Sequence, residues 1–226
     1  MLEVHDLGRV RYAEALVIQK DIVERRKQGR VPDQLLFVEH PHVLTQGRNG
    51  RAENLLASEA ALRSAGIDYH ATDRGGDITY HGPGQIVGYP ILDLREWKRD
   101  VGAYVRAIEQ VIIDALEQFE IIAGRVTGCT GVWVDGKKVA SIGIHISRWV
   151  TSHGFALNHT TDLRYFQYIV PCGLTKPVTS MQELGSESTR AEVLDALSTS
   201  FAHHFHGDQP NRDREGAAFS FTETYS

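Results

Sequence analysis

The dipeptide Asp135-Gly136, a turn signal between two apolar segments, restricts the fold of this chain more than any other feature. The first segment is 132–134 (Val-Trp-Val), and the second extends over 139–147. An Asp-Gly pair in this position favours a two-residue β-hairpin, because the tight turn needs positive φ at both central residues. We therefore expect two antiparallel strands that belong to a larger sheet.

Four segments have apolar residues at helical spacing, and four further segments are predicted to be strands. The expected helices are 12–27, 58–65, 101–119 and 190–205, and the expected additional strands are 34–39, 67–73, 86–94 and 154–158. Ser58 is expected to be an N-cap, and Pro90 indicates an edge strand or a bulge. The sequence thus predicts an α/β protein of the α+β type, with a mixed, largely antiparallel sheet flanked by helices.

Length and composition limit the possible classes of protein. A chain of 226 residues with 42% hydrophobic residues fits one large domain, which we place at residues 1–206, followed by a polar and loosely ordered tail at 207–226. The net charge of −5 gives no nucleic-acid signal, and no apolar run is long enough for a membrane span. Two cysteines without a CxxC pair and an N-terminus without a signal peptide predict a cytoplasmic protein.

Three features together suggest acyl transfer through a thioester. Cys172 lies in a Pro-Cys-Gly tripeptide, Lys138 opens a strand of small residues, and segment 74–85 is rich in glycine. A thiolate is the reactive form of cysteine, and a nearby ammonium stabilises it. The alternatives are a buried apolar thiol and an exposed hairpin lysine, for which Lys137 competes with Lys138. We expect Cys129 to lie in a flexible turn, and we interpret it as structural.

Histidine clusters raise the question of a metal site. The sequence contains His40-Pro41-His42 and the run 203–206 among its eleven histidines. Neither has a zinc-like spacing with cysteine or acidic partners. We expect no metal and no cofactor.

Six segments in this order resemble the lipoyl(octanoyl) transferases of lipoate biosynthesis, also called octanoyl-carrier-protein:protein N-octanoyltransferases. The segments are 39–48, 74–85, 131–134, 138–143, 153–158 and 169–173. The resemblance covers residues 1 to 205 and implies a fold similar to that of the biotin protein ligase and lipoate ligase catalytic domains. It implies that Cys172 carries the acyl thioester and that Lys138 lowers the pKa of Cys172.

The resemblance also implies a substrate site and two protein partners. The expected substrate-binding residues are Arg74, Gly75, Gly76, Asp77, Ile78, Thr79, Tyr80, His81, Ser141, Ile142, Gly143, Gly154, Phe155 and Ala156. The expected donor is octanoyl-acyl carrier protein, and the expected acceptors are apo-lipoyl domains of 2-oxoacid dehydrogenase complexes and the glycine cleavage H protein. We expect a monomer. Because carrier proteins are acidic, Arg25, Arg26, Lys27, Arg48 and Arg51 are docking candidates.

Two other classes of function stay open from the sequence. An ATP-dependent lipoate or biotin-type ligase on the same fold would need no cysteine nucleophile, so ATP dependence distinguishes it from a transferase. A non-catalytic module that binds carrier protein or lipoyl domains would keep its binding after a Cys172→Ala substitution. A papain-like hydrolase is disfavoured because its sequence signature around cysteine is absent.

Overall fold

A computed structural model describes residues 1–170 and 176–207 of the chain. Cys172 and residues 208–226 of the expected tail lie outside the described residues. The described chain forms a seven-stranded sheet with the order β1-β2-β6-β10-β9-β8-β7. In this sheet only the β1–β2 pair is parallel, which confirms the mixed, largely antiparallel prediction. Its strands are β1 (Leu2–Arg9), β2 (Asp33–Glu39), β6 (Gln85–Ile91), β7 (Gly124–Val126), β8 (Cys129–Val134), β9 (Lys137–Ser147) and β10 (Val150–Asn158).

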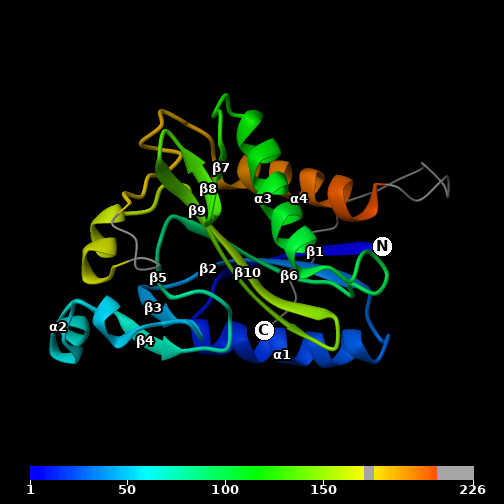
Figure 1. Ribbon diagram of the computed structural model, residues 1–226, viewed down its shortest axis with the longest axis horizontal. Helices are drawn as coiled ribbons and strands as arrows, with labels where there is room; N and C mark the ends of the chain where they lie inside the picture. Colours follow the sequence, from blue (N-terminus) through cyan, green and yellow to red (C-terminus); the bar gives the residue numbers. More distant parts are fainter. Residues whose placement is uncertain (171–175, 208–226) are drawn as a thin grey trace.

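Helices cover both faces of the large sheet (Figure 1). α3 (Val101–Glu117) and α4 (Arg190–His206) lie on one face, and α1 (Tyr12–Lys27) lies on the other. Side chains alternate between the faces of a strand, so Leu35 of β2 packs in the cluster with α3 and α4 while Leu36 packs in the cluster with α1. The same alternation separates Phe155 from Ala156 on β10. Both faces of the central strands are therefore buried.

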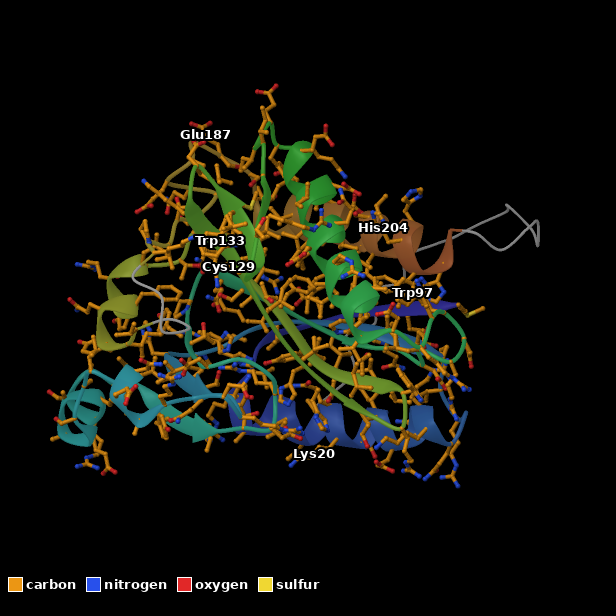
Figure 2. The ribbon with its side chains drawn as sticks, viewed as in Figure 1. Lys20, Trp97, Cys129, Trp133, Glu187 and His204 are labelled. Carbon is orange, nitrogen blue, oxygen red and sulfur yellow. The ribbon has the colours of Figure 1, made fainter. Side chains whose placement is uncertain are left out.

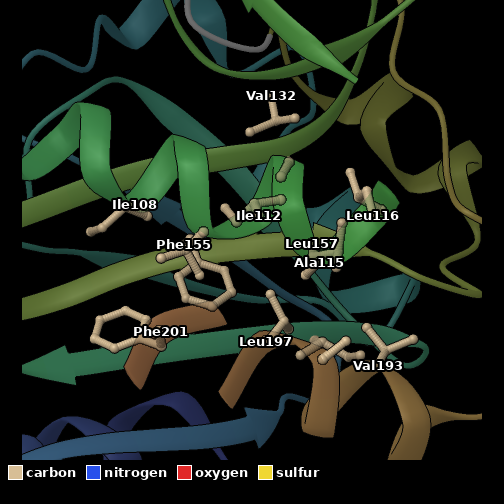
Figure 3. Packing of buried hydrophobic residues seen from close by; sticks show 14 of the residues in the cluster. Ile108, Ile112, Ala115, Leu116, Val132, Phe155, Leu157, Val193, Leu197 and Phe201 are labelled. Atoms are coloured by element: carbon tan, nitrogen blue, oxygen red, sulfur yellow. The ribbon is translucent and has the colours of Figure 1, made fainter. Parts of the chain in front are cut away.

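The cluster between the sheet and the two later helices forms the largest part of the core (Figure 3). Ile108 and Ile112, one helical turn apart on α3, share it with Phe155 of β10 and with Leu197 and Phe201 of α4. All five side chains are buried. Burial of each such side chain stabilises the fold by about 1.5–3 kcal/mol. This packing fixes β10, which lines the cavity described below.

Side-chain caps set where the helices begin. Asp100 accepts a hydrogen bond from the backbone N–H of Ala103 at 2.9 Å, and α3 starts at the next residue. Thr189 and Glu192 form a reciprocal capping box at the start of α4. Ser58 accepts from Ala61 N at 3.2 Å, which confirms the predicted N-cap of α2 (Glu59–Ser64).

A second, three-stranded sheet lies beside the large one, with α2 at its end (Figure 1). Its order is β4-β3-β5, with β4 (Asp68–Ala71) parallel and β5 (Ile78–His81) antiparallel to β3 (Val43–Gln46). The short 3₁₀ turn η2 (Leu163–Tyr168) packs against this sheet, and Asn54 of η1 (Ala52–Asn54) is hydrogen-bonded to Asp77, directly before β5. The sequence did not predict β3 or β5, and it missed the outer strands β1 and β7 of the large sheet.

The predicted hairpin and the predicted strand at 86–94 are confirmed, but the interpretation of Pro90 is wrong. Asp135 and Gly136 have φ of 47° and 77°, and they join β8 to β9. Pro90 does not mark an edge strand or a bulge, because β6 lies between β2 and β10 and Pro90 pairs in regular register with Leu35. The β6–β10 ladder ends at Gly88, so Pro90 lies where β6 pairs only with β2 and the missing N–H is tolerated.

Candidate functional site

A cavity of about 760 Å³ is lined by residues of both sheets, of α1 and of α3. Its lining includes Lys138 and these substrate-binding candidates: Arg74, Gly75, Gly76, Asp77, Ile78, Thr79, His81, Ser141, Ile142, Gly143, Gly154, Phe155 and Ala156. The fold therefore brings together three sequence segments that are far apart in the chain.

The segment 74–77 forms a loop against the β9 strand. Gly75 N donates to Ile144 O at 2.7 Å, and Arg48 N donates to Arg74 O at 3.0 Å. The Asp77 carboxylate accepts hydrogen bonds from Arg51 N and from the Asn54 side chain. These contacts hold a glycine-rich loop in one position at the cavity wall.

The groups at the β5 end of the cavity are neutral rings. His81 is buried, and burial lowers its pKa to about 3, so its imidazole is neutral at physiological pH. Because Gln85 Oε1 can only accept, His81 Nδ1 carries the ring proton and donates to it at 2.8 Å. Burial likewise raises the pKa of the Tyr12 and Tyr89 phenols. His81 is thus suited to bind and orient a substrate as a neutral ring rather than to act as a cation.

Tyr80 is not among the cavity-lining residues. Its buried ring points to the other side of β5, where it stacks on Tyr165 with ring centroids 5.2 Å apart. Its hydroxyl lies 2.8 Å from His42 Nδ1. Neighbouring residues on a strand point to opposite faces, which separates Tyr80 from Thr79 and His81.

Lys138 lies near the start of β9 and lines the cavity. Its side chain is buried, whereas that of Lys137 is exposed, as strand alternation predicts. Its backbone N–H donates to Pro177 O at 2.9 Å, and its carbonyl accepts from Thr179 N at 3.0 Å. The chain just beyond residue 175 is therefore hydrogen-bonded to the strand that carries Lys138.

The second cysteine lies at the start of a strand rather than in a turn. Cys129 is the first residue of β8, and it is half-buried and lines the cavity. Its Sγ lies 3.9 Å from Lys176 Nζ. Figure 2 shows Cys129 beside Trp133, on the same strand.

Several cavity residues were not among the sequence candidates. Tyr12 was assigned only to the buried face of a helix, and Tyr89 only to a strand. His153 lines the cavity with a φ of 55°, and its Nε2 lies 2.8 Å from Asp73 Oδ1. In the sequence, the available signal for His153 was its place at the start of the resembling segment 153–158. In the structure, its positive φ also distinguishes it, because such a φ is uncommon for a residue other than glycine.

The residues expected to dock the carrier protein differ in their exposure and position in the structure. Arg51 lines the cavity, and exposed Arg48 lies 2.6 Å from His145 Nδ1. Arg26, in contrast, is buried and paired with Asp33 and Glu96 at 2.8 and 2.7 Å, so its expected docking role is wrong. Its charge is needed inside the fold.

The side chains and helices in the part of the chain that the structure describes bear on metal binding and on membrane crossing. No group of three His, Cys, Asp or Glu side chains there could hold a metal ion. No helix there has the length and apolar character to cross a bilayer.

The fold is that of the lipoate and biotin protein ligases. A solved bipartite lipoate protein ligase from Thermoplasma acidophilum superposes with a TM-score of 0.71 at 16% identity, covering 90% of this chain and 84% of that one. The biotin protein ligase of Aquifex aeolicus gives a TM-score of 0.57 at 15% identity, covering 89% and 69%. These similarities confirm the predicted fold class.

Comparison of the sequence with known proteins identifies the family to which the chain belongs. The family model described as "Lipoyl protein ligase A/B catalytic domain" matches residues 11–202, and the chain belongs to this family. A protein of Solibacter usitatus named "Octanoyltransferase" is 62% identical over 202 residues, which is 89% of this chain and 92% of that protein.

Proposed function

We propose that this protein is an acyltransferase of lipoate biosynthesis that transfers an octanoyl group to lysine side chains of lipoyl domains. The observation that carries the proposal is the buried Lys138 at a cavity shared with the glycine-rich loop, in a chain 62% identical to a protein named Octanoyltransferase. The cavity is large enough for a medium-length acyl chain. Burial of six methylenes of an octanoyl tail is worth about 5 kcal/mol.

The first half-reaction makes an acyl-enzyme on Cys172. The thiolate of Cys172, stabilised by the Lys138 ammonium, attacks the carbonyl carbon of the octanoyl thioester on acyl carrier protein. The carbon–sulfur bond to the carrier breaks, and the carrier sulfur takes the proton from Lys138. Octanoyl-Cys172 and a neutral Lys138 amine remain. Support comes from the sequence position of Cys172, five residues before Pro177, whose carbonyl accepts the Lys138 N–H.

The second half-reaction regenerates the starting pair. The neutral amine of the acceptor lysine attacks octanoyl-Cys172, Lys138 takes the amine proton, and the Cys172 thiolate leaves. The products are an octanoyl amide and the original thiolate–ammonium pair. Because the carrier leaves after the acyl-enzyme forms and before the acceptor lysine reacts, the mechanism predicts ping-pong kinetics.

The domain and partner expectations belong to the same proposal. Residues 1–206 form the catalytic domain, and the enzyme acts as a cytoplasmic monomer. Its donor is octanoyl-acyl carrier protein. Its acceptors are the lipoyl domains of 2-oxoacid dehydrogenase complexes and the glycine cleavage H protein.

The test is the intact mass of the protein after mixing with octanoyl-acyl carrier protein. We expect a mass increase of one octanoyl group that hydroxylamine removes and that maps to Cys172. The adduct should persist in Cys129→Ser, the matched control, and be absent in Cys172→Ala. An active enzyme without any adduct would exclude the covalent route, and a requirement for ATP would indicate a ligase.

A further inference from the structure

Trp133 and Lys138 face each other across the β8–β9 hairpin. The tight turn at Asp135-Gly136 sets a register in which these two residues are direct cross-strand partners. Lys138 Nζ lies 4.7 Å from the centroid of the indole ring. Both residues are buried, with exposed fractions of 3% for Trp133 and 6% for Lys138. An ammonium over the face of an aromatic ring at this distance is attracted by the ring quadrupole, and more strongly where water is excluded.

The indole ring is itself held in place. Its Nε1–H donates to the carbonyl oxygen of Cys129 at 3.2 Å, within the same strand. Figure 2 shows Trp133 and Cys129 next to each other. The ring can therefore act as a fixed surface for a flexible lysine side chain.

Gly131 leaves room for the same lysine. Its φ is +124°, and a Cβ at this position would lie 2.6 Å from Ala140 O and 3.3 Å from Lys138 Cε. Its backbone N–H donates to the carboxylate of Glu109 at 3.0 Å. The lysine methylenes thus pass over a glycine anchored by α3, and the ammonium ends at the indole.

We propose that Trp133 is a positioning residue, which holds the ammonium of Lys138 beside the cavity by a cation–π contact. The inference rests on the proposed function, because it gives Trp133 its role through Lys138. A lysine side chain is a flexible four-carbon stem that ends in a compact charge, so contact with a fixed ring reduces the number of positions that the ammonium samples. Lys176 Nζ lies 5.2 Å from the same ring, and Trp133 therefore contacts two ammonium groups.

The test compares a variant that keeps the aromatic face with one that removes it. The readout is the alkylation rate of Cys172 by iodoacetamide between pH 6 and 9, followed by peptide mass so that Cys129 is scored separately. We expect Trp133→Leu to slow alkylation at pH 7 by about three- to thirtyfold and to move the pH midpoint upward. Trp133→Phe should stay within about threefold of the wild type.

Lys138→Met separates positioning from a general structural effect. In this background Trp133→Leu should cause no further loss of alkylation rate, because the group that Trp133 positions is gone. A Trp133→Leu profile that coincides with the wild type, or an equal loss in the Lys138→Met background, would overturn the inference. If the wild type forms the octanoyl adduct normally, such a result leaves the proposed function intact.

A measurement on the wild-type protein tests the contact directly, and two conservative variants serve only to assign the signal. Protons on the Lys138 Cε, if held over the indole, give an NMR signal shifted upfield by the ring current. The signal should be lost in Lys138→Arg and kept in Lys176→Arg. A lysine spectrum without an upfield-shifted Cε signal assigned to Lys138 would contradict the contact.

Discussion

Arg74 donates through Nε and Nη2 to the hydroxyl of Thr45, at 3.2 and 2.9 Å, and so joins the cavity loop to β3. Since the guanidinium only donates, the hydroxyl proton of Thr45 is free to point to His81 Nε2, 3.3 Å away. The ring proton of His81 is then on Nδ1, in agreement with its contact to Gln85. One hydroxyl of β3 thus orients two cavity residues, Arg74 and His81, from the same glycine-rich segment 74–85.

Replacement of Thr45 by valine tests this arrangement. Valine has the same shape but no hydroxyl, so the buried Arg74 loses an acceptor and His81 Nε2 loses a donor. We expect a loss of about 1–3 kcal/mol in the free energy of unfolding, measured by urea denaturation. Thr45→Ser keeps the hydroxyl and should retain most of the stability. Equal stability of the valine variant and the wild type would show that the hydroxyl is not needed.

Gly143 determines how closely the cavity loop approaches β9. A Cβ at Gly143 would lie 2.9 Å from Gly75 O and 3.1 Å from Arg74 Cδ, so Gly143→Ala must displace the loop. We expect a higher KM for the octanoyl donor and a destabilisation of about 1–3 kcal/mol. Gly124→Ala is the matched control, because nothing lies within 4 Å of its Cβ. If both variants show the same KM in a transfer assay, the close approach has no role in substrate binding.

The parts of the fold that the sequence predicted have strong local signals. The hairpin depends on two turn residues, and α1 and α3 depend on apolar residues repeated over four or more helical turns. β5, in contrast, lies inside a glycine-rich segment, and its pairing with β3 connects residues more than thirty positions apart. Such a long-range pairing has no local signature, so the segment was interpreted as a loop alone.

The residues of the candidate site likewise include some that the sequence predicted and some that it did not. Strand alternation is a local rule, and it predicted that Lys137 and Lys138 point to opposite faces. The choice of Lys138 as the functional lysine came from the resemblance to the family. The contribution of Tyr12 from α1 and of Tyr89 from β6 depends on how distant elements pack. Tyr80 was expected at the substrate site with its neighbours, but the packing of β5 against η2 turns its ring away. Motif membership alone does not determine which face of a strand reaches a cavity.

The buried position of Arg26 predicts a role in the stability of the fold instead of a role in docking. Its guanidinium pairs with Asp33 at 2.8 Å and with Asp93 at 3.8 Å, and both carboxylates are buried. Arg26→Met should therefore lower the free energy of unfolding by about 3–5 kcal/mol, because it leaves the buried Asp33 carboxylate without its guanidinium partner, whereas Asp93 keeps Arg95. Arg25→Met is the control, since exposed Arg25 forms an ion pair with exposed Asp21 at 3.4 Å. We expect that variant to lose less than about 1 kcal/mol. Similar losses in both variants on denaturation would contradict the assignment.

The buried ring of His40 predicts how stability depends on pH. Its Nδ1 donates to Val10 O at 2.7 Å, and its Nε2 accepts from the Tyr89 hydroxyl at 2.7 Å. Burial lowers the pKa of His40 to about 4, while the unfolded chain binds the proton near pH 6.5. The contribution of His40 to stability is therefore complete above pH 6.5 and is lost, at up to about 1.4 kcal/mol per pH unit, as the pH falls towards 4. Urea denaturation at pH 7.5 and pH 5.5 should show a smaller difference in His40→Gln than in the wild type, whereas the exposed-site control His203→Gln should keep the full difference. An unchanged difference in His40→Gln would mean that the ring accepts a proton in the folded state, which would require the Tyr89 hydroxyl to turn and accept.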